Sequence, residues 1–155
     1  MHERSKLREA RHFLDRMQAE RDNPPAFTRE LSAFMSAARS VLQYALEEAK
    51  LKPGGQHWYD QAMAGPLLSF FKDKRDISIH KRPVDPVRRM TTEAAGLLNI
   101  GDDDEIMIPY PHMRIVEHYE FPDRPGDDVI DISRRYVADL EAFVEDGLSK
   151  GWIRG

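Results

Sequence analysis

Apolar residues recur at intervals of three and four along most of the chain, the spacing that places them on one face of a helix. Two such segments fill the first third of the sequence. One ends before Pro24-Pro25, and the other continues to Pro53-Gly54-Gly55 with Thr28 as its expected N-cap. Their apolar positions are Leu7, Ala10, Leu14 and Met17, then Phe27, Leu31, Phe34, Ala38, Val41, Leu42, Ala45 and Ala49. We expect these two helices to be antiparallel neighbours.

Two further apolar segments extend the helical pattern. The third segment runs from Trp58 to Phe71, and Gly65-Pro66 in its middle is expected to kink or divide it. The last begins near Asp131 or Ser133 and carries its apolar residues at Val137, Leu140, Phe143, Val144 and Leu148. The chain is thus predicted to be mainly α, a single domain over residues 1–155 built on four helices.

The pattern changes between about residues 87 and 121, where short β-branched or aromatic stretches are interrupted by proline. Met107–Pro111 and Ile115–Phe121 are interpreted as strands. Residues 87–100 have features of both helix and strand, and we interpret them as a strand that pairs with 105–109. The acidic run 101–105 is then a turn, because the spacing of an EF-hand calcium loop is absent. These segments predict a small antiparallel β insertion.

Composition narrows the class of protein. The 155 residues are 41% hydrophobic and 32% charged and include no cysteine, which excludes disulfides, thiolate zinc sites and a cysteine nucleophile. The chain has no apolar run long enough to cross a bilayer, and its first residues are charged where a signal peptide would be apolar. We therefore expect a cytoplasmic protein with no membrane association. No motif indicates a cofactor or a metal, and His112 and His118 lie too far apart along a strand for one ion.

Charge is distributed unevenly. The net charge is −4, yet the segment from Lys72 to Arg89 contains seven basic and three acidic residues. The excess of +4 in this segment leaves −8 for the rest of the chain, so that the segment alone is suited to attract a polyanion.

Within this segment, Arg75 and His80 are candidates for catalysis. If Asp76 caps a helical turn that begins at Ile77, Arg75 and His80 occupy the two positions that face each other across a helix entrance. In one continuous helix, by contrast, they would point about 140° apart. A guanidinium binds phosphate through paired donors, and an imidazole exchanges protons near neutral pH. Together they could bind a phosphodiester and deprotonate a ribose hydroxyl without a metal. Lys74, Asp76, Lys81 and Arg82 are the neighbouring residues expected to contact the substrate.

The stretch Arg75-Asp76-Ile77-Ser78-Ile79-His80 resembles the Arg-x(4–6)-His motif of the HEPN superfamily, in which a polar residue follows the arginine. The resemblance covers the helical segments and not the β insertion. It implies a four-helix up-and-down bundle and a homodimer whose two motifs meet in one composite site for metal-independent RNA cleavage. There His80 would be the general base and Arg75 would hold the scissile phosphate. A role in toxin or defence biology, with an antitoxin or other protein partner, is implied in the same way.

Two other interpretations remain open. Arg75 would pair with Asp73 or Asp76 and His80 with a backbone carbonyl if the motif only fixes the loop before the strands. Alternatively, the domain is a non-catalytic HEPN-like module that binds RNA, nucleotide or a partner protein.

Overall fold

The computed structural model describes residues 2–80, 85–95 and 112–154. Within these ranges the chain forms five helices and one two-stranded antiparallel sheet. In chain order they are α1 (His2–Ala19), α2 (Pro24–Ala49), α3 (Gly55–Ala62), α4 (Pro66–His80), β1 (Val87–Ala95), β2 (His112–Glu120) and α5 (Val129–Ser149). The predicted mainly helical class with a small antiparallel insertion is confirmed.

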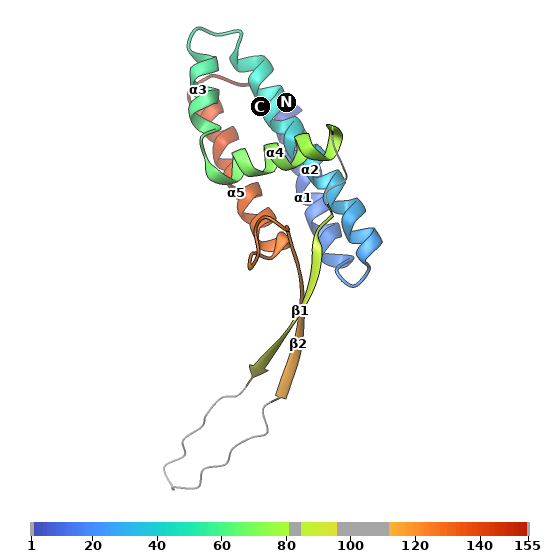
Figure 1. Ribbon diagram of the computed structural model, residues 1–155. Helices are drawn as coiled ribbons and strands as arrows, with labels where there is room; N and C mark the ends of the chain where they lie inside the picture. The colour runs from blue at the N-terminus through green and yellow to red at the C-terminus, as the bar shows by residue number, and fades with distance from the viewer. Residues whose placement is uncertain (1, 81–84, 96–111, 155) are drawn as a thin grey trace, which may run out of the picture.

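The long helices α1, α2 and α5 run side by side, whereas α4 lies across them (Figure 1). Within the described residues the chain has five helices instead of the predicted four, and the four-helix up-and-down bundle that the resemblance implies is not confirmed. The third apolar segment divides at Gly65-Pro66 into α3 and α4, because proline cannot donate the backbone hydrogen bond that would continue α3. The chain changes direction at this break, and α4 then crosses the bundle.

Two prolines mark the turn between α1 and α2 and the start of α2. Pro24 and Pro25 occupy the first positions of α2, where the missing N–H has no helical acceptor to lose. The Asn23 side chain accepts a hydrogen bond from the backbone N–H of Ala26 and caps the helix. The expected cap at Thr28 is thus wrong, because the helix begins one turn earlier.

Five aromatic rings join α2, α4, α5 and the segment after β2. We call Phe34, Phe70, Phe71, Phe121 and Tyr136 the aromatic cluster. Phe71 stacks on Tyr136 with ring centroids 4.2 Å apart and meets Phe34 edge to face at 5.9 Å. Phe121 contacts Phe70 and Phe71 at 5.5 and 6.1 Å. Phe121 therefore ties the base of the hairpin to the core.

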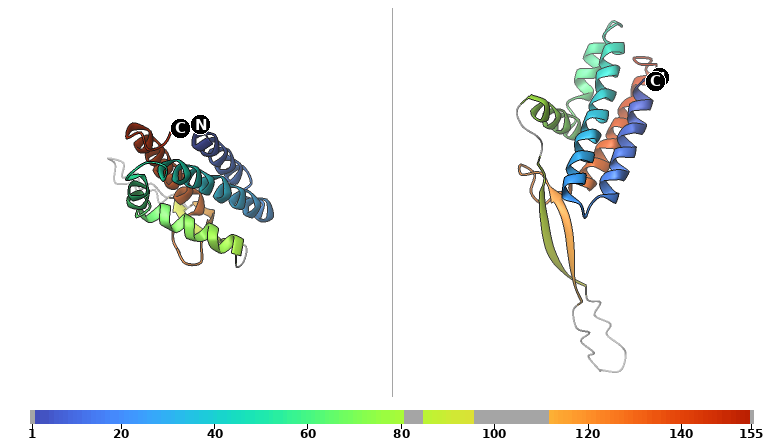
Figure 2. Two further views of the ribbon diagram at one scale, coloured as in Figure 1. Left: turned by 90° about the horizontal axis from the view of Figure 1, so that it is seen from above. Right: turned by 90° about the vertical axis from the view of Figure 1, so that its right-hand side faces the viewer.

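Strands β1 and β2 form a hairpin that projects beyond one end of the bundle, while α1 begins and α5 ends at the other (Figure 2). The register pairs Val87 with Glu120 and Ala95 with His112. Residues 87–95 therefore pair with 112–120, and the expected partner strand at 105–109 lies outside the described residues. The predicted strand 107–111 and turn 101–105 lie outside the described residues. At its base the hairpin is anchored by Tyr119, which stacks on Phe27 at 3.8 Å.

Replacing Phe71 by alanine tests the importance of the aromatic cluster. Phe71→Ala is expected to lower the free energy of unfolding by about 3–5 kcal/mol, because it removes a buried ring that contacts four others. The exposed Leu51 supplies a control, since Leu51→Ala should change stability by only about 0.5 kcal/mol. Urea denaturation followed by circular dichroism measures both. Similar losses in the two variants would contradict the assignment of the core.

Candidate functional site

Helix α4 runs without a break through the Arg75–His80 motif. It extends from Pro66 to His80, so that Asp76 lies inside the helix and does not cap a new turn. The expected approach of Arg75 and His80 across a helix entrance is therefore wrong. In a continuous helix, positions 75 and 80 lie about 140° apart around the axis. One copy of α4 thus presents the two positions in different directions.

Arg75 lies at a half-buried position of α4. Among the half-buried arginines of the described residues, Arg21, Arg39 and Arg124 bond to Asp128, Tyr59 and Asp127. Arg75 differs from these, because neither it nor the half-buried Asp76 has a side-chain partner within the described ranges. The expected internal pairing of Arg75 with Asp73 or Asp76 is absent. A guanidinium in this situation gains from an anion supplied by another molecule.

The other residues of the predicted site fall into two groups. Lys74 is held internally: its ammonium bonds to Asp123 at 2.5 Å and lies 5.2 Å from the ring centres of both Phe70 and Phe121. Its side chain is 12% exposed, which favours a structural role for Lys74 over the predicted contact with substrate. Lys81 and Arg82 lie outside the described residues, and at His80 the description covers the backbone.

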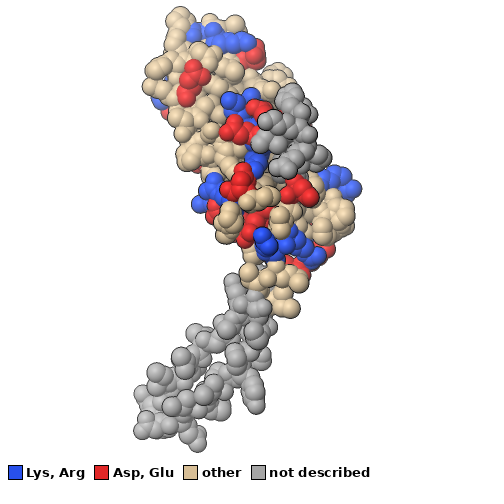
Figure 3. Space-filling model, viewed as in Figure 1, with Lys and Arg blue, Asp and Glu red and all other residues tan. Residues whose placement is uncertain are grey.

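Basic residues do not merge into one positive surface on the face seen in Figure 3. Lysine and arginine side chains alternate there with aspartate and glutamate over the bundle and the base of the hairpin. Many of these neighbours are paired, as in Arg124 with Asp127 and Lys74 with Asp123. The excess of +4 in the sequence is therefore partly neutralised by acidic residues that folding brings from elsewhere.

A second group of charged and titratable side chains gathers at the base of the hairpin. We call Arg89, His118 and Glu120 the hairpin-base cluster. The register places Arg89 directly opposite His118, and Glu120 lies two positions after His118 on the same face of β2. Nε2 of His118 lies 2.8 Å from Oε1 of Glu120, while Nε of Arg89 lies 3.5 Å from Oε2. One carboxylate thus holds an imidazole and a guanidinium together.

The charge state of Glu120 follows from these contacts. The hydrogen bond from His118 lowers the pKa of Glu120 below its ordinary value, against the opposing effect of burial. A backbone N–H of Gly126 and the charge of Arg89 act in the same direction as His118. Because an ionised carboxylate only accepts hydrogen bonds, Nε2 of His118 carries the shared proton. The other ring nitrogen, Nδ1, is then the basic one.

Sequence reasoning missed the hairpin-base cluster because it considered His118 only as a metal ligand together with His112. The spacing of His118 and Glu120 was a usable signal, since residues two apart in a strand share a face. The sequence could not predict that Arg89 lies beside His118, because this depends on a strand register that pairs positions 29 residues apart. Among the described residues, no group of His, Asp and Glu is arranged to hold a metal ion.

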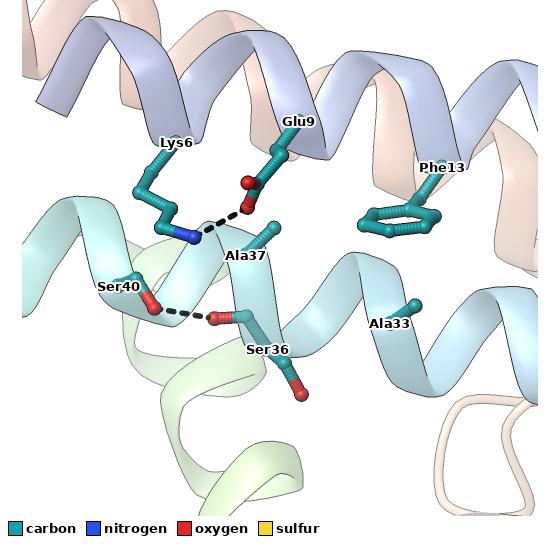
Figure 4. Close-up of a pocket in the computed structure, with 7 residues that line it drawn as sticks. All are labelled: Lys6, Glu9, Phe13, Ala33, Ser36, Ala37 and Ser40. Atoms are coloured by element: carbon teal, nitrogen blue, oxygen red, sulfur yellow. Dashed lines mark hydrogen bonds and ion pairs between the residues drawn. The ribbon is translucent and has the colours of Figure 1, made fainter. Parts of the chain in front are cut away.

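A shallow groove of about 250 Å³ lies between α1 and α2 (Figure 4). It is lined by Lys6, Glu9, Phe13, Ala33, Ser36, Ala37 and Ser40. Lys6 donates a 2.6 Å hydrogen bond to Glu9, and the hydroxyls of Ser36 and Ser40 donate to backbone carbonyls of their own helix. Its polar side chains are thus bonded within the protein, and the groove is best described as a packing seam of small residues.

The pH dependence of stability tests the ionic state of Glu120. Because its pKa is lower in the folded protein than its ordinary value of 4.5, Glu120 contributes stability above pH 4.5 that is lost as the pH falls through the folded pKa. In Glu120→Gln, the free energy of unfolding should therefore fall less steeply below pH 4.5 than in the wild type. Urea denaturation at a series of pH values measures the slope. Equal slopes would show that Glu120 is not held in its ionised form.

Among the described helices, none combines the length and apolar character needed to span a membrane. Comparison of the chain with protein-family models, with curated proteins and with solved structures finds no match.

Proposed function

We propose that this protein is a metal-independent endoribonuclease that acts as a homodimer, with Arg75 and His80 as its catalytic residues. One observation carries the proposal: Arg75 is half-buried without a counter-charge in the described residues, five positions before a histidine on the same helix. This agrees with the resemblance of the motif to that of HEPN ribonucleases.

The chemistry of the two residues suits RNA. The neutral imidazole of His80 would take the proton of a ribose 2′-hydroxyl, whose oxygen then attacks the adjacent phosphorus. The bond from phosphorus to the 5′-oxygen breaks, and the leaving oxygen takes a proton. The guanidinium of Arg75 would bind the phosphate and stabilise the charge that develops on its oxygens. The nucleophile belongs to the substrate, so that no covalent intermediate with the protein forms.

The continuous helix supports a site composed of two chains. Because positions 75 and 80 are about 140° apart on one helix, they are poorly placed to act on the same phosphate. A twofold axis near the end of α4 would bring Arg75 of one copy toward His80 of the other. Each dimer would then contain two equivalent sites, and a monomer would contain none.

Mixing two inactive variants tests this arrangement. Arg75→Ala and His80→Ala should each reduce RNA cleavage in the presence of a chelator by about 10²-fold or more. When the two variants are refolded together in equal amounts, half of the dimers should contain one intact site. The mixture should therefore recover about a quarter of the wild-type rate. Cleavage of a fluorescently labelled single-stranded RNA provides the measurement.

A matched mixture supplies the control. Refolding His80→Ala with a chain that carries both substitutions leaves no intact site, so this mixture should stay inactive. Asp73→Ala, on an exposed position of the same helix, should cleave at the wild-type rate. Failure of the first mixture to regain activity would contradict the two-chain site, and cleavage that persists in His80→Ala would contradict its role as the base. RNA binding without cleavage by the wild type would support a non-catalytic binding module instead.

A further inference from the structure

The hairpin-base cluster contains side-chain nitrogens that no contact within the described residues uses. Arg89 contacts Glu120 through Nε, which leaves its terminal nitrogens without an ion pair in the described residues, and its side chain is 58% exposed. His118 uses Nε2 for Glu120, and Nδ1 has no partner within the same ranges. The two side chains are neighbours across the strands. A planar guanidinium and an imidazole therefore lie side by side on one face.

Glu120 fixes this arrangement. Its side chain is 11% exposed and accepts hydrogen bonds from His118 and from the backbone of Gly126, so that its oxygens are engaged within the protein. The largely buried carboxylate of Glu120 thus orients the imidazole of His118 and restrains the guanidinium of Arg89. The open terminal nitrogens of Arg89, beside the imidazole, suit an anion with several acceptor oxygens.

We propose that Arg89 and His118, positioned by Glu120, bind a phosphate group of single-stranded RNA at the base of the hairpin. This subsite rests on the proposed function and is separate from the phosphate that would be cleaved at Arg75 and His80. Arg89 supplies the permanent positive charge, and the imidazole of His118 lies directly opposite it in the sheet. Glu120 is a positioning residue that does not touch the RNA.

The location of the cluster agrees with a role beside the catalytic helix. Directly after Glu120, Phe121 packs against Phe70 of α4, and Asp123 binds Lys74, the residue before Arg75. Arg124 also lies over the ring of Phe70, at 5.2 Å. The base of the hairpin therefore packs against α4 at Phe70 and Lys74, just before the motif. An RNA strand held at Arg89 would lie near that end of the helix.

The opposite face of the hairpin provides a built-in comparison. Arg88, the preceding residue, pairs with Glu117 on the other face of the sheet. The hydrogen bond that Arg88 donates to Glu117 raises the pKa of Arg88, as expected for a guanidinium already paired with a carboxylate. Arg88 and Arg89 thus have the same charge and adjacent places in β1, but different partners. Arg88→Gln is accordingly the matched control for Arg89→Gln.

The experiment measures RNA binding in the His80→Ala background, where the RNA stays intact. The probe is a fluorescent single-stranded RNA in chelator at low salt, and anisotropy gives the dissociation constant. Arg89→Gln should weaken binding by about 5–20-fold and reduce the dependence on salt by about one ion. His118→Gln should weaken binding less, because Arg89 carries the charge, and Arg88→Gln should change it by less than about twofold. Circular dichroism verifies that each variant is folded.

Two RNA probes distinguish the source of the phosphate. One has a 5′-hydroxyl and the other a 5′-phosphate. An equal loss of affinity in Arg89→Gln for both identifies an internal phosphodiester, and a loss confined to the second identifies a terminal phosphate. Either result supports the subsite. Equal affinities of Arg88→Gln and Arg89→Gln, or no binding of either probe, would overturn it.

The subsite and the cleavage reaction can fail separately. Loss of affinity in Arg89→Gln without any cleavage by the wild type would leave the subsite standing and reject the endoribonuclease. Cleavage that depends on Arg75 and His80, with affinity unaffected by Arg89→Gln, would reject the subsite alone.

Discussion

The stacked contact between Phe71 and Tyr136 is the interaction on which the arrangement of the molecule depends. The 4.2 Å separation of their rings fixes α4 to α5, and the edge contact of Phe71 with Phe34 fixes it to α2. A helix that crosses others touches them over a short length, so that large side chains at the crossing must supply most of the burial. Because Phe121 joins the same cluster, the position of the hairpin follows from that of α4.

The continuity of α4 decides how its motif can work. A helix that ended at Asp76 would have allowed one chain to bring Arg75 and His80 together, whereas an unbroken helix directs the two positions apart. On the proposal that both residues act on one phosphate, the activity would require two associated chains and would depend on protein concentration.

The two faces of the hairpin carry different charged and apolar side chains. Its two faces differ at the base, where Arg88 is paired with Glu117 and Arg89 remains exposed beside His118. Further out, Met90 and Ile115 are exposed on the face that carries Arg88. A two-stranded hairpin gains little stability by itself, and this one depends on the stacking of Tyr119 on Phe27 at its base. The hairpin-base cluster thus lies at the end of the hairpin that packs against the bundle.

The sequence by itself determined the local structure. The three- and four-residue spacing of apolar positions identified the long helices, and Gly65-Pro66 located the break between α3 and α4, because these signals act over a few residues. The sequence also singled out Arg75, which has no side-chain partner within the described residues. Only the tertiary structure decided the crossing of α4, the strand register and the grouping of Arg89, His118 and Glu120. These features depend on contacts between residues far apart in the chain, which local spacing cannot encode.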